Sequence, residues 1–163
     1  MRNRRLQAEL QKLMQLNDMS DLIQVEPVRG QLDRYAVTFN CRGLMWPEGA
    51  AGPAITARHQ CEIYLHLDFP RKPPQIKWLT EIFHPNILPP RQNGGVCIGS
   101  WTPAETLDHL VVRLFEMVQM KNYSVHDALD LRAAAWAKQH IAQFPLDNRH
   151  AHRAEDVFEI ELA

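Results

Sequence analysis

Residues 34–41, Arg34-Tyr35-Ala36-Val37-Thr38-Phe39-Asn40-Cys41, alternate between side chains suited to a core and side chains suited to solvent. A period of two is typical of a strand that buries one face, because successive side chains point to opposite sides. Residues 60–67 repeat the pattern, with an apolar face made by Cys61, Ile63, Leu65 and Leu67. These two strands predict an antiparallel sheet, which weaker strand signals at 22–26 and 75–79 would extend.

Helical patterns flank the strands. In residues 4–16 the apolar side chains recur at helical spacing. Thr102-Pro103-Ala104-Glu105 has the pattern of a capping box with proline at the first helical position, and predicts a helix that starts there. Residues 131–141 predict a further helix, which Pro145 ends. The order of elements predicts an α+β fold: an antiparallel meander of about four strands flanked by an N-terminal helix and C-terminal helices.

The length of 163 residues fits a single domain over residues 1–163. Apolar residues make up 45% of the chain, which is enough to bury a core. The tail at 147–163 is weakly determined, although its apolar residues would let it dock as a short strand or helix: Val157, Phe158, Ile160 and Leu162.

A formal net charge of -1 argues against a globally basic nucleic-acid binder. No apolar run approaches the roughly 20 residues of a membrane span, and no apolar signal region follows the basic N-terminus. We therefore expect no nucleic-acid or membrane partner and a cytoplasmic location. The chain has 3 cysteines, an odd number that argues against a disulfide framework. It has no CxxC or HExxH pattern, so we expect no metal and no cofactor.

Residues 83–101 break the regular patterns, because prolines and glycines recur along them. This segment is either a long ordered loop or a disordered one, and long irregular segments in compact domains often carry function. Cys97 lies between Gly95 and Gly99, which leave its sulfur open to a macromolecular partner. A thiolate there would be a nucleophile. The alternative is a partly buried cysteine that acts as a small apolar side chain, and spacing alone leaves both open.

The motif Phe83-His84-Pro85-Asn86-Ile87 lies just upstream. The amide NH2 of Asn86 can donate to a developing oxyanion, and His84 can act as a base. Turn chemistry is the competing explanation, because Asn and His side chains often satisfy the backbone of loops. On local grounds alone, the turn explanation is favoured for both residues.

The motifs occur in a definite order: Phe69-Pro70-Arg71-Lys72-Pro73-Pro74, Phe83-His84-Pro85-Asn86-Ile87, Val96-Cys97-Ile98 and Trp101-Thr102-Pro103-Ala104. Together they closely resemble the E2 ubiquitin-conjugating enzyme family, which has FP..PP, HPNI, a glycine-flanked cysteine and W.P in the same order. The resemblance covers about Tyr35 to Trp136, and the basic N-terminal helix is similar to the first helix of the family. It implies a UBC-like fold and a transferase that carries a ubiquitin-like protein as a thioester and passes it to a lysine or another amine.

The resemblance also implies roles for individual residues. Cys97 matches the thioester-forming cysteine, and Asn86 matches the asparagine that supports the oxyanion or orders the active-site loop. His84 matches a residue that is mainly structural. Asp127 is the candidate for the acidic residue that positions or deprotonates the attacking lysine, since an ammonium has no lone pair. Its surroundings depart from the proline-rich pattern of the family, so His126 is an alternative, and both residues are equally compatible with a solvated loop.

Partners follow from the same resemblance: a ubiquitin-like modifier, an E1-like activating enzyme, and a target protein or ligase. Arg4 and Arg5 lie on the helix that meets the activating enzyme in the family. Pro103 and Ala104 match the loop that helps meet E3 ligases. No cofactor is implied, because the activating enzyme uses the ATP.

The chain departs from the family pattern at three places, two of which flank the cysteine. The stretch from Asn86 to Cys97 is longer than usual, and the stretch from Cys97 to Trp101 is shorter. Arg71 replaces an aromatic residue that many members use for RING-type ligases. A domain with these departures resembles the prokaryotic E2-like proteins found beside ubiquitin-like modifiers in antiphage operons.

Two other functions compete with the transferase. A binding module of the same fold would carry no modifier, but variants of that kind lack the cysteine that this chain has. A Cys/His hydrolase would need a histidine oriented by a third group, and the sequence shows no such pattern.

Overall fold

The computed structural model describes residues 1–153, so the predicted docking of residues 157–162 lies outside the described part. The main sheet has four antiparallel strands in the order β1-β2-β5-β6. They are β1 (Ile23–Pro27), β2 (Arg34–Phe39), β5 (His59–Tyr64) and β6 (Gln75–Trp78). Val37 of β2 lies opposite Val25 on one side and Cys61 on the other. The predicted α+β class with its antiparallel meander is confirmed.

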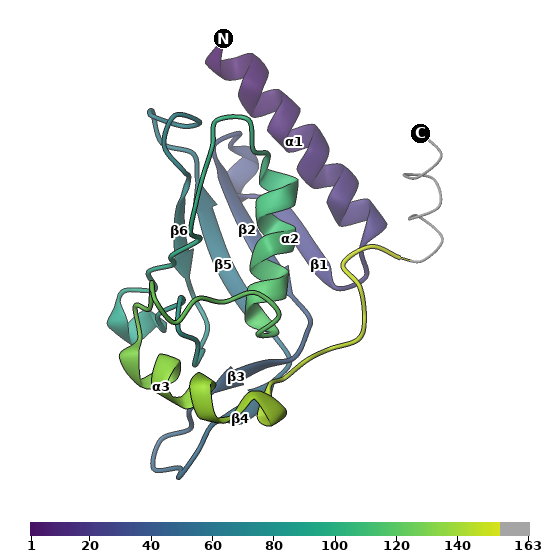
Figure 1. The fold of residues 1–163 in the computed structure, drawn as a ribbon. Coiled ribbons are helices and arrows are strands. Elements are labelled where there is room, and N and C mark those ends of the chain that lie inside the picture. The colour runs from purple at the N-terminus through teal and green to yellow at the C-terminus, as the bar shows by residue number, and fades with distance from the viewer. Residues whose placement is uncertain (154–163) are drawn as a thin grey trace.

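Two helices cover the apolar face of this sheet. In Figure 1, α1 (Arg2–Met19) runs beside β1, and α2 (Leu107–Val118) lies across the middle of the sheet. The Phe39 ring joins α2 to β6: it is stacked on Trp78 at 5.9 Å between ring centroids and tilted against Phe115 at 6.5 Å. All three rings are buried, and burial of such side chains stabilises the fold by about 1.5–3 kcal/mol each.

A smaller two-stranded sheet lies between β2 and β5 along the chain, and the sequence did not predict it. β3 (Gly43–Met45) pairs with β4 (Ala54–Thr56), and the Gly- and Pro-rich residues 46–53 connect them. The helix α3 (Leu131–Gln139) packs beside this sheet through Trp136, whose ring lies 5.9 Å from that of Phe83. Strands of three residues are too short to show a period of two in the sequence.

α2 begins at Leu107, so the predicted start at Pro103 was wrong. Thr102 and Glu105 form a turn instead, in which Glu105 N–H donates to the Thr102 carbonyl at 3.0 Å and Thr102 N–H donates to Glu105 Oε1 at 2.9 Å. The N–H of Leu107 is satisfied by Glu9 Oε2 from α1 at 2.8 Å. Because a carboxylate from a distant helix accepts this bond, the start of α2 is not set by its own neighbours.

Other boundaries shift by a few residues. Leu67 was predicted to face the core but is 85% exposed, because β5 ends at Tyr64 and the chain then turns away from the sheet. α3 ends before Ile141, and short 3-10 helices occupy Val28–Gly30, Pro90–Gln92 and Ile141–Gln143. Within the described part, no helix combines the length and the apolar character that crossing a membrane requires.

Two histidines are buried next to the core. Burial lowers the pKa of His59 from 6.5 to about 4 and that of His84 to about 3. Both rings are therefore neutral in the folded protein at neutral pH, whereas the unfolded chain binds these protons below about pH 6.5. Because the unfolded state takes up the protons first, the free energy of unfolding should fall as the pH drops from about 6.5 to about 4.

We expect urea unfolding to give a free energy of unfolding that is lower at pH 5.0 than at pH 7.5 by about 2 kcal/mol for each of the two histidines. His59→Gln should remove about half of this pH dependence. His109→Gln, at an exposed position on α2, is the control and should keep it. A pH dependence that is the same in His59→Gln as in the wild type would contradict this account.

Candidate active site

The segment that contains Cys97 is an ordered loop, held by backbone hydrogen bonds. Trp78 N–H donates to the Gly94 carbonyl at 2.8 Å, and Cys97 N–H donates to the Asn86 carbonyl at 2.9 Å. Gly94 has a φ of 66°, and a Cβ at this position would lie 2.5 Å from the backbone oxygen of Trp78. Only glycine fits there, so the loop stays tight against β6.

Cys97 is the accessible thiol of this chain. Cys41 and Cys61 are 0% exposed, whereas Cys97 is partly exposed. Burial raises the pKa of Cys41 to about 12 and also raises that of Cys61. The two core cysteines therefore behave as small apolar side chains, and Cys97 is the thiol that a partner can reach.

Asn86 joins Cys97 to the segment that follows α2. Its Nδ2 donates to the backbone carbonyls of Ser124 at 2.8 Å and Asp127 at 3.2 Å. Its Oδ1 accepts from Ser124 N–H at 2.8 Å. Both amide hydrogens are thus engaged, so donation to an oxyanion would require one of these bonds to break. Of the two roles that the resemblance implied, this geometry supports ordering of the loop.

His84 is buried two residues before Asn86. It is 1% exposed, and its Nδ1 accepts from Asn86 N–H at 2.9 Å. The low pKa that burial imposes keeps the ring neutral, and its accepting nitrogen is already occupied. His84 therefore serves the backbone of the motif, and the geometry gives it no role as a base toward Cys97.

A small cavity of about 80 Å³ lies beside Cys97. It is lined by residues from the cysteine loop, α2 and the following segment: Asn86, Cys97, Ile98, Gly99, Met117, Asn122, Tyr123, Ser124 and Asp127. The structure thus brings together the predicted site residues Cys97, Asn86 and Asp127, whereas His84 is not among the residues that line the cavity. Asn122 and Tyr123 were missed, and no local pattern in the sequence marks them.

Asp127 is exposed at the rim of this cavity, and its backbone is fixed by Asn86. His126 is also exposed but is not among the lining residues. Of the two candidates for activating an amine, Asp127 is therefore the better placed. In the described part of the chain, no group of three or more His, Cys, Asp or Glu side chains is arranged to hold a metal ion.

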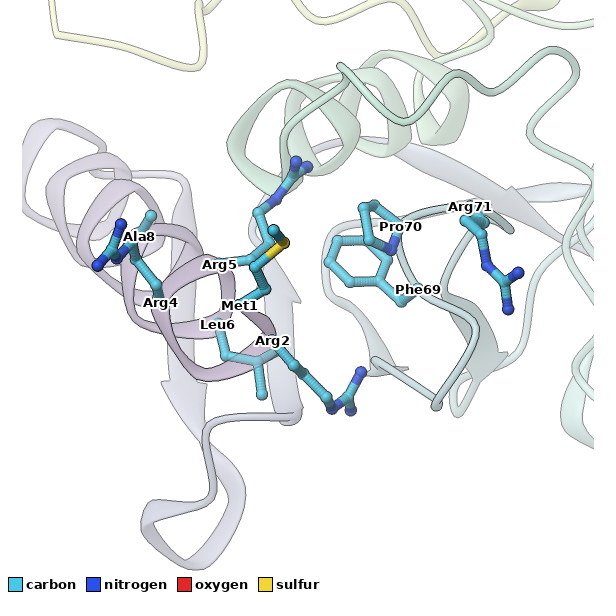
Figure 2. Close-up of a pocket in the computed structure, with 9 residues that line it drawn as sticks. All are labelled: Met1, Arg2, Arg4, Arg5, Leu6, Ala8, Phe69, Pro70 and Arg71. Carbon is cyan, nitrogen blue, oxygen red and sulfur yellow. The ribbon is translucent and has the colours of Figure 1, made fainter.

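A second concave surface, which we call the arginine groove, lies between the start of α1 and the loop after β5. Figure 2 shows Phe69 and Pro70 facing α1 across it. The groove encloses about 580 Å³ and is lined by apolar side chains and four arginines: Met1, Arg2, Arg4, Arg5, Leu6, Ala8, Phe69, Pro70 and Arg71. This arrangement suits a partner that presents both apolar and acidic groups.

The four residues predicted to meet partners have different environments. Arg4 is exposed at the groove, and Pro103 and Ala104 are exposed in the turn before α2. Arg5 is engaged within the chain, because its guanidinium pairs with Glu9 at 2.6 Å and donates to the carbonyls of Pro103 and Glu105. Arg5 thus ties the groove to the Pro103–Ala104 turn, and Arg4 is the more available of the two for a partner.

Comparison with known proteins agrees with this architecture. The family model described as ubiquitin-conjugating enzyme matches residues 5–151. Ubiquitin-conjugating enzyme E2 2 of Saccharomyces cerevisiae is 28% identical over 109 residues, which cover 62% of this chain and 60% of that protein. Ubiquitin-conjugating enzyme E2 S of Drosophila erecta is 32% identical over 72 residues, covering 41% and 33%. The match thus spans about three fifths of the yeast relative's length.

The fold is shared with solved structures. The E2 domain of a Toxoplasma gondii ubiquitin conjugating enzyme superposes with a TM-score of 0.60 at 24% identity, over 87% of this chain and 90% of that one. The sheet, the flanking helices and the ordered loop are therefore those of a UBC fold. Because the family model covers most of the sequence, this chain belongs to the ubiquitin-conjugating enzyme family.

Proposed function

We propose that Cys97 accepts a ubiquitin-like protein from an E1-like enzyme as a thioester and passes it to an amine, most simply a lysine. The observation that carries this proposal is the placement of the one accessible thiol beside a cavity at the end of an ordered loop. In the first step the Cys97 thiolate attacks the thioester carbonyl on the activating enzyme, whose own thiolate leaves. In the second step a neutral amine attacks the Cys97 thioester, the Cys97 thiolate leaves, and the amine loses a proton.

The surrounding residues have positioning roles in this proposal. Asn86 holds the segment 124–127 against Cys97, and His84 holds Asn86. Asp127, at the rim of the cavity, accepts the proton of the attacking amine or orients it. Positioning of this kind contributes because a bound acceptor reacts at high effective concentration when its approach is constrained.

The arginine groove and the adjacent turn are the proposed surface for the activating enzyme and for a ligase or target. Arg4 supplies exposed positive charge there, while Phe69 and Pro70 supply apolar contact. Pro103 and Ala104 lie next to the groove, because Arg5 binds the backbone of their turn. Arg71 stands in the groove wall in place of the aromatic residue expected for RING-type ligases, which favours a different kind of partner.

The proposed setting is that of the prokaryotic E2-like proteins of antiphage operons, in the cytoplasm. The features that support this finer placement are Arg71 and the short stretch between Cys97 and Trp101. One domain over residues 1–163 is part of the same proposal.

The thioester is tested by incubating the protein with its E1-like enzyme, the modifier and ATP. We expect an adduct on non-reducing gels that reductant removes. Cys97→Ser should give an ester that survives reductant, or no adduct, while Cys41→Ala should be loaded like the wild type. If the wild type forms no adduct while the same E1 charges another protein, Cys97 does not carry the modifier, and a binding module takes the place of the transferase.

Asn86→Ala should slow discharge of the loaded protein to free lysine about tenfold, because segment 124–127, which lines the cavity, loses its hydrogen bonds to Asn86. Loading should persist, and amide hydrogen exchange over residues 122–128 should become faster. Asn148→Ala, at an exposed position outside the cavity, is the control and should leave both discharge and exchange unchanged. If Asn86→Ala slows discharge but leaves amide hydrogen exchange unchanged, the Asn86 side chain would instead act by supporting the oxyanion.

Arg4→Glu should slow loading by the activating enzyme about fivefold at low salt, and 0.5 M NaCl should reduce this difference because charge steering is screened. Lys12→Glu makes the same charge change at an exposed position of α1 outside the groove, and should have little effect. Equal slowing by the two variants would argue against the groove as the site of contact.

A further inference from the structure

The two sides of Cys97 are held in different ways. Upstream, Val96 forms a β-bridge with Ile87, and Cys97 N–H donates to the Asn86 carbonyl. Downstream, Ile98–Ser100 contain no helix or strand. Among the described residues, the hydrogen bonds that reach this downstream segment come from one side chain, that of Arg113 on α2.

The Arg113 guanidinium contacts three acceptors from two segments. Its Nη1 donates to the backbone carbonyls of Ile98 at 3.3 Å and Ser100 at 3.1 Å. Its Nη2 donates to the carboxylate of Glu105, and the two side chains are 25% and 21% exposed. A half-buried cation with three acceptors is held more firmly than a surface ion pair, because the guanidinium presents its donors in a fixed fork.

The segment that Arg113 holds is part of the reaction site. Ile98 and Gly99 line the cavity beside Cys97, as do Asn86 and the Ser124 that it binds. We propose that Arg113 is a positioning residue that fixes Ile98–Ser100 against α2, and thereby sets the path along which an acceptor reaches Cys97. The role of Arg113 toward an acceptor rests on the proposed function, whereas its effect on the position of the cysteine loop does not.

α2 is a suitable anchor for this purpose. Its buried face is packed into the core through Leu110, Leu114 and other residues, so the helix holds the backbone of Arg113 in place. Glu105 in turn accepts from Thr102 N–H, and its backbone carbonyl accepts from Arg5. Arg113 therefore also connects the cysteine loop to the turn beside the arginine groove.

The first test measures the rate at which iodoacetamide alkylates each cysteine, read by peptide mass spectrometry. In the folded wild type only Cys97 should react, since Cys41 and Cys61 are 0% exposed. Arg113→Ala should speed the reaction of Cys97 about fivefold and leave both core cysteines unlabelled. Arg113→Lys, which keeps the charge but lacks the fork, should rescue this effect in part. Arg34→Ala breaks a comparable ion pair, with Glu62, and should match the wild type.

Two results would overturn the proposal. A Cys97 rate in Arg113→Ala within twofold of the wild type would show that the contact does not hold the loop. Labelling of Cys41 and Cys61 together with Cys97 would show that Arg113 supports the whole fold and has no local role.

The second test compares loading with discharge of the loaded protein to free lysine. Arg113→Ala should be loaded within twofold of the wild type but should discharge about tenfold more slowly, a split that a loss of overall stability would not produce. Discharge within twofold of the wild type would overturn the role toward the acceptor. If the wild type itself forms no thioester, the proposed function fails, and the alkylation test still decides whether Arg113 positions the loop.

Discussion

The buried side chain of Asn86 makes the contact on which the geometry around Cys97 depends. The side chain bonds to the backbone of Ser124 and Asp127, while the backbone carbonyl of Asn86 accepts from Cys97 N–H. One residue thus joins the loop before the cysteine, the cysteine itself and the segment after α2. Asn86 is 2% exposed, so losing any of these bonds would leave a buried polar group unpaired, at about 1–3 kcal/mol.

These hydrogen bonds of Asn86 explain how a loop without regular secondary structure can hold the Cys97 thiol in one position. His84 accepts from Asn86 N–H, and the Pro85 carbonyl accepts from the N–H groups of Leu129 and Asp130 just before α3. Asp130 in turn caps α3 by accepting from Ala133 N–H at 3.0 Å. The motif is therefore fastened on both sides, and the partly exposed Cys97 lies next to a rigid support.

The contacts of α1 hold the arginine groove in a similar way. Glu9 is 1% exposed and bonds both to Arg5 and to the first N–H of α2. Arg5 then binds the turn that carries Pro103, and Glu105 of that turn meets Arg113. The helix that borders the arginine groove and the helix that borders Cys97 are thus joined through charged groups, and each of these groups has its partner within the chain.

The sequence by itself determined the α+β class, the four main strands, α1, α3 and the order of motifs that marks the ubiquitin-conjugating enzyme family. Those features depend on alternation, helical spacing and residues adjacent in the chain. Only the tertiary structure decided that α2 starts at Leu107 and that Asn122 and Tyr123 line the cavity. It also decided that both amide hydrogens of Asn86 bond to the segment after α2. The hydrogen bonds that hold Asn86 and the start of α2 join residues that are 38 to 98 positions apart in the sequence. Such bonds form only when packing brings the segments together, so no local pattern in the chain encodes them.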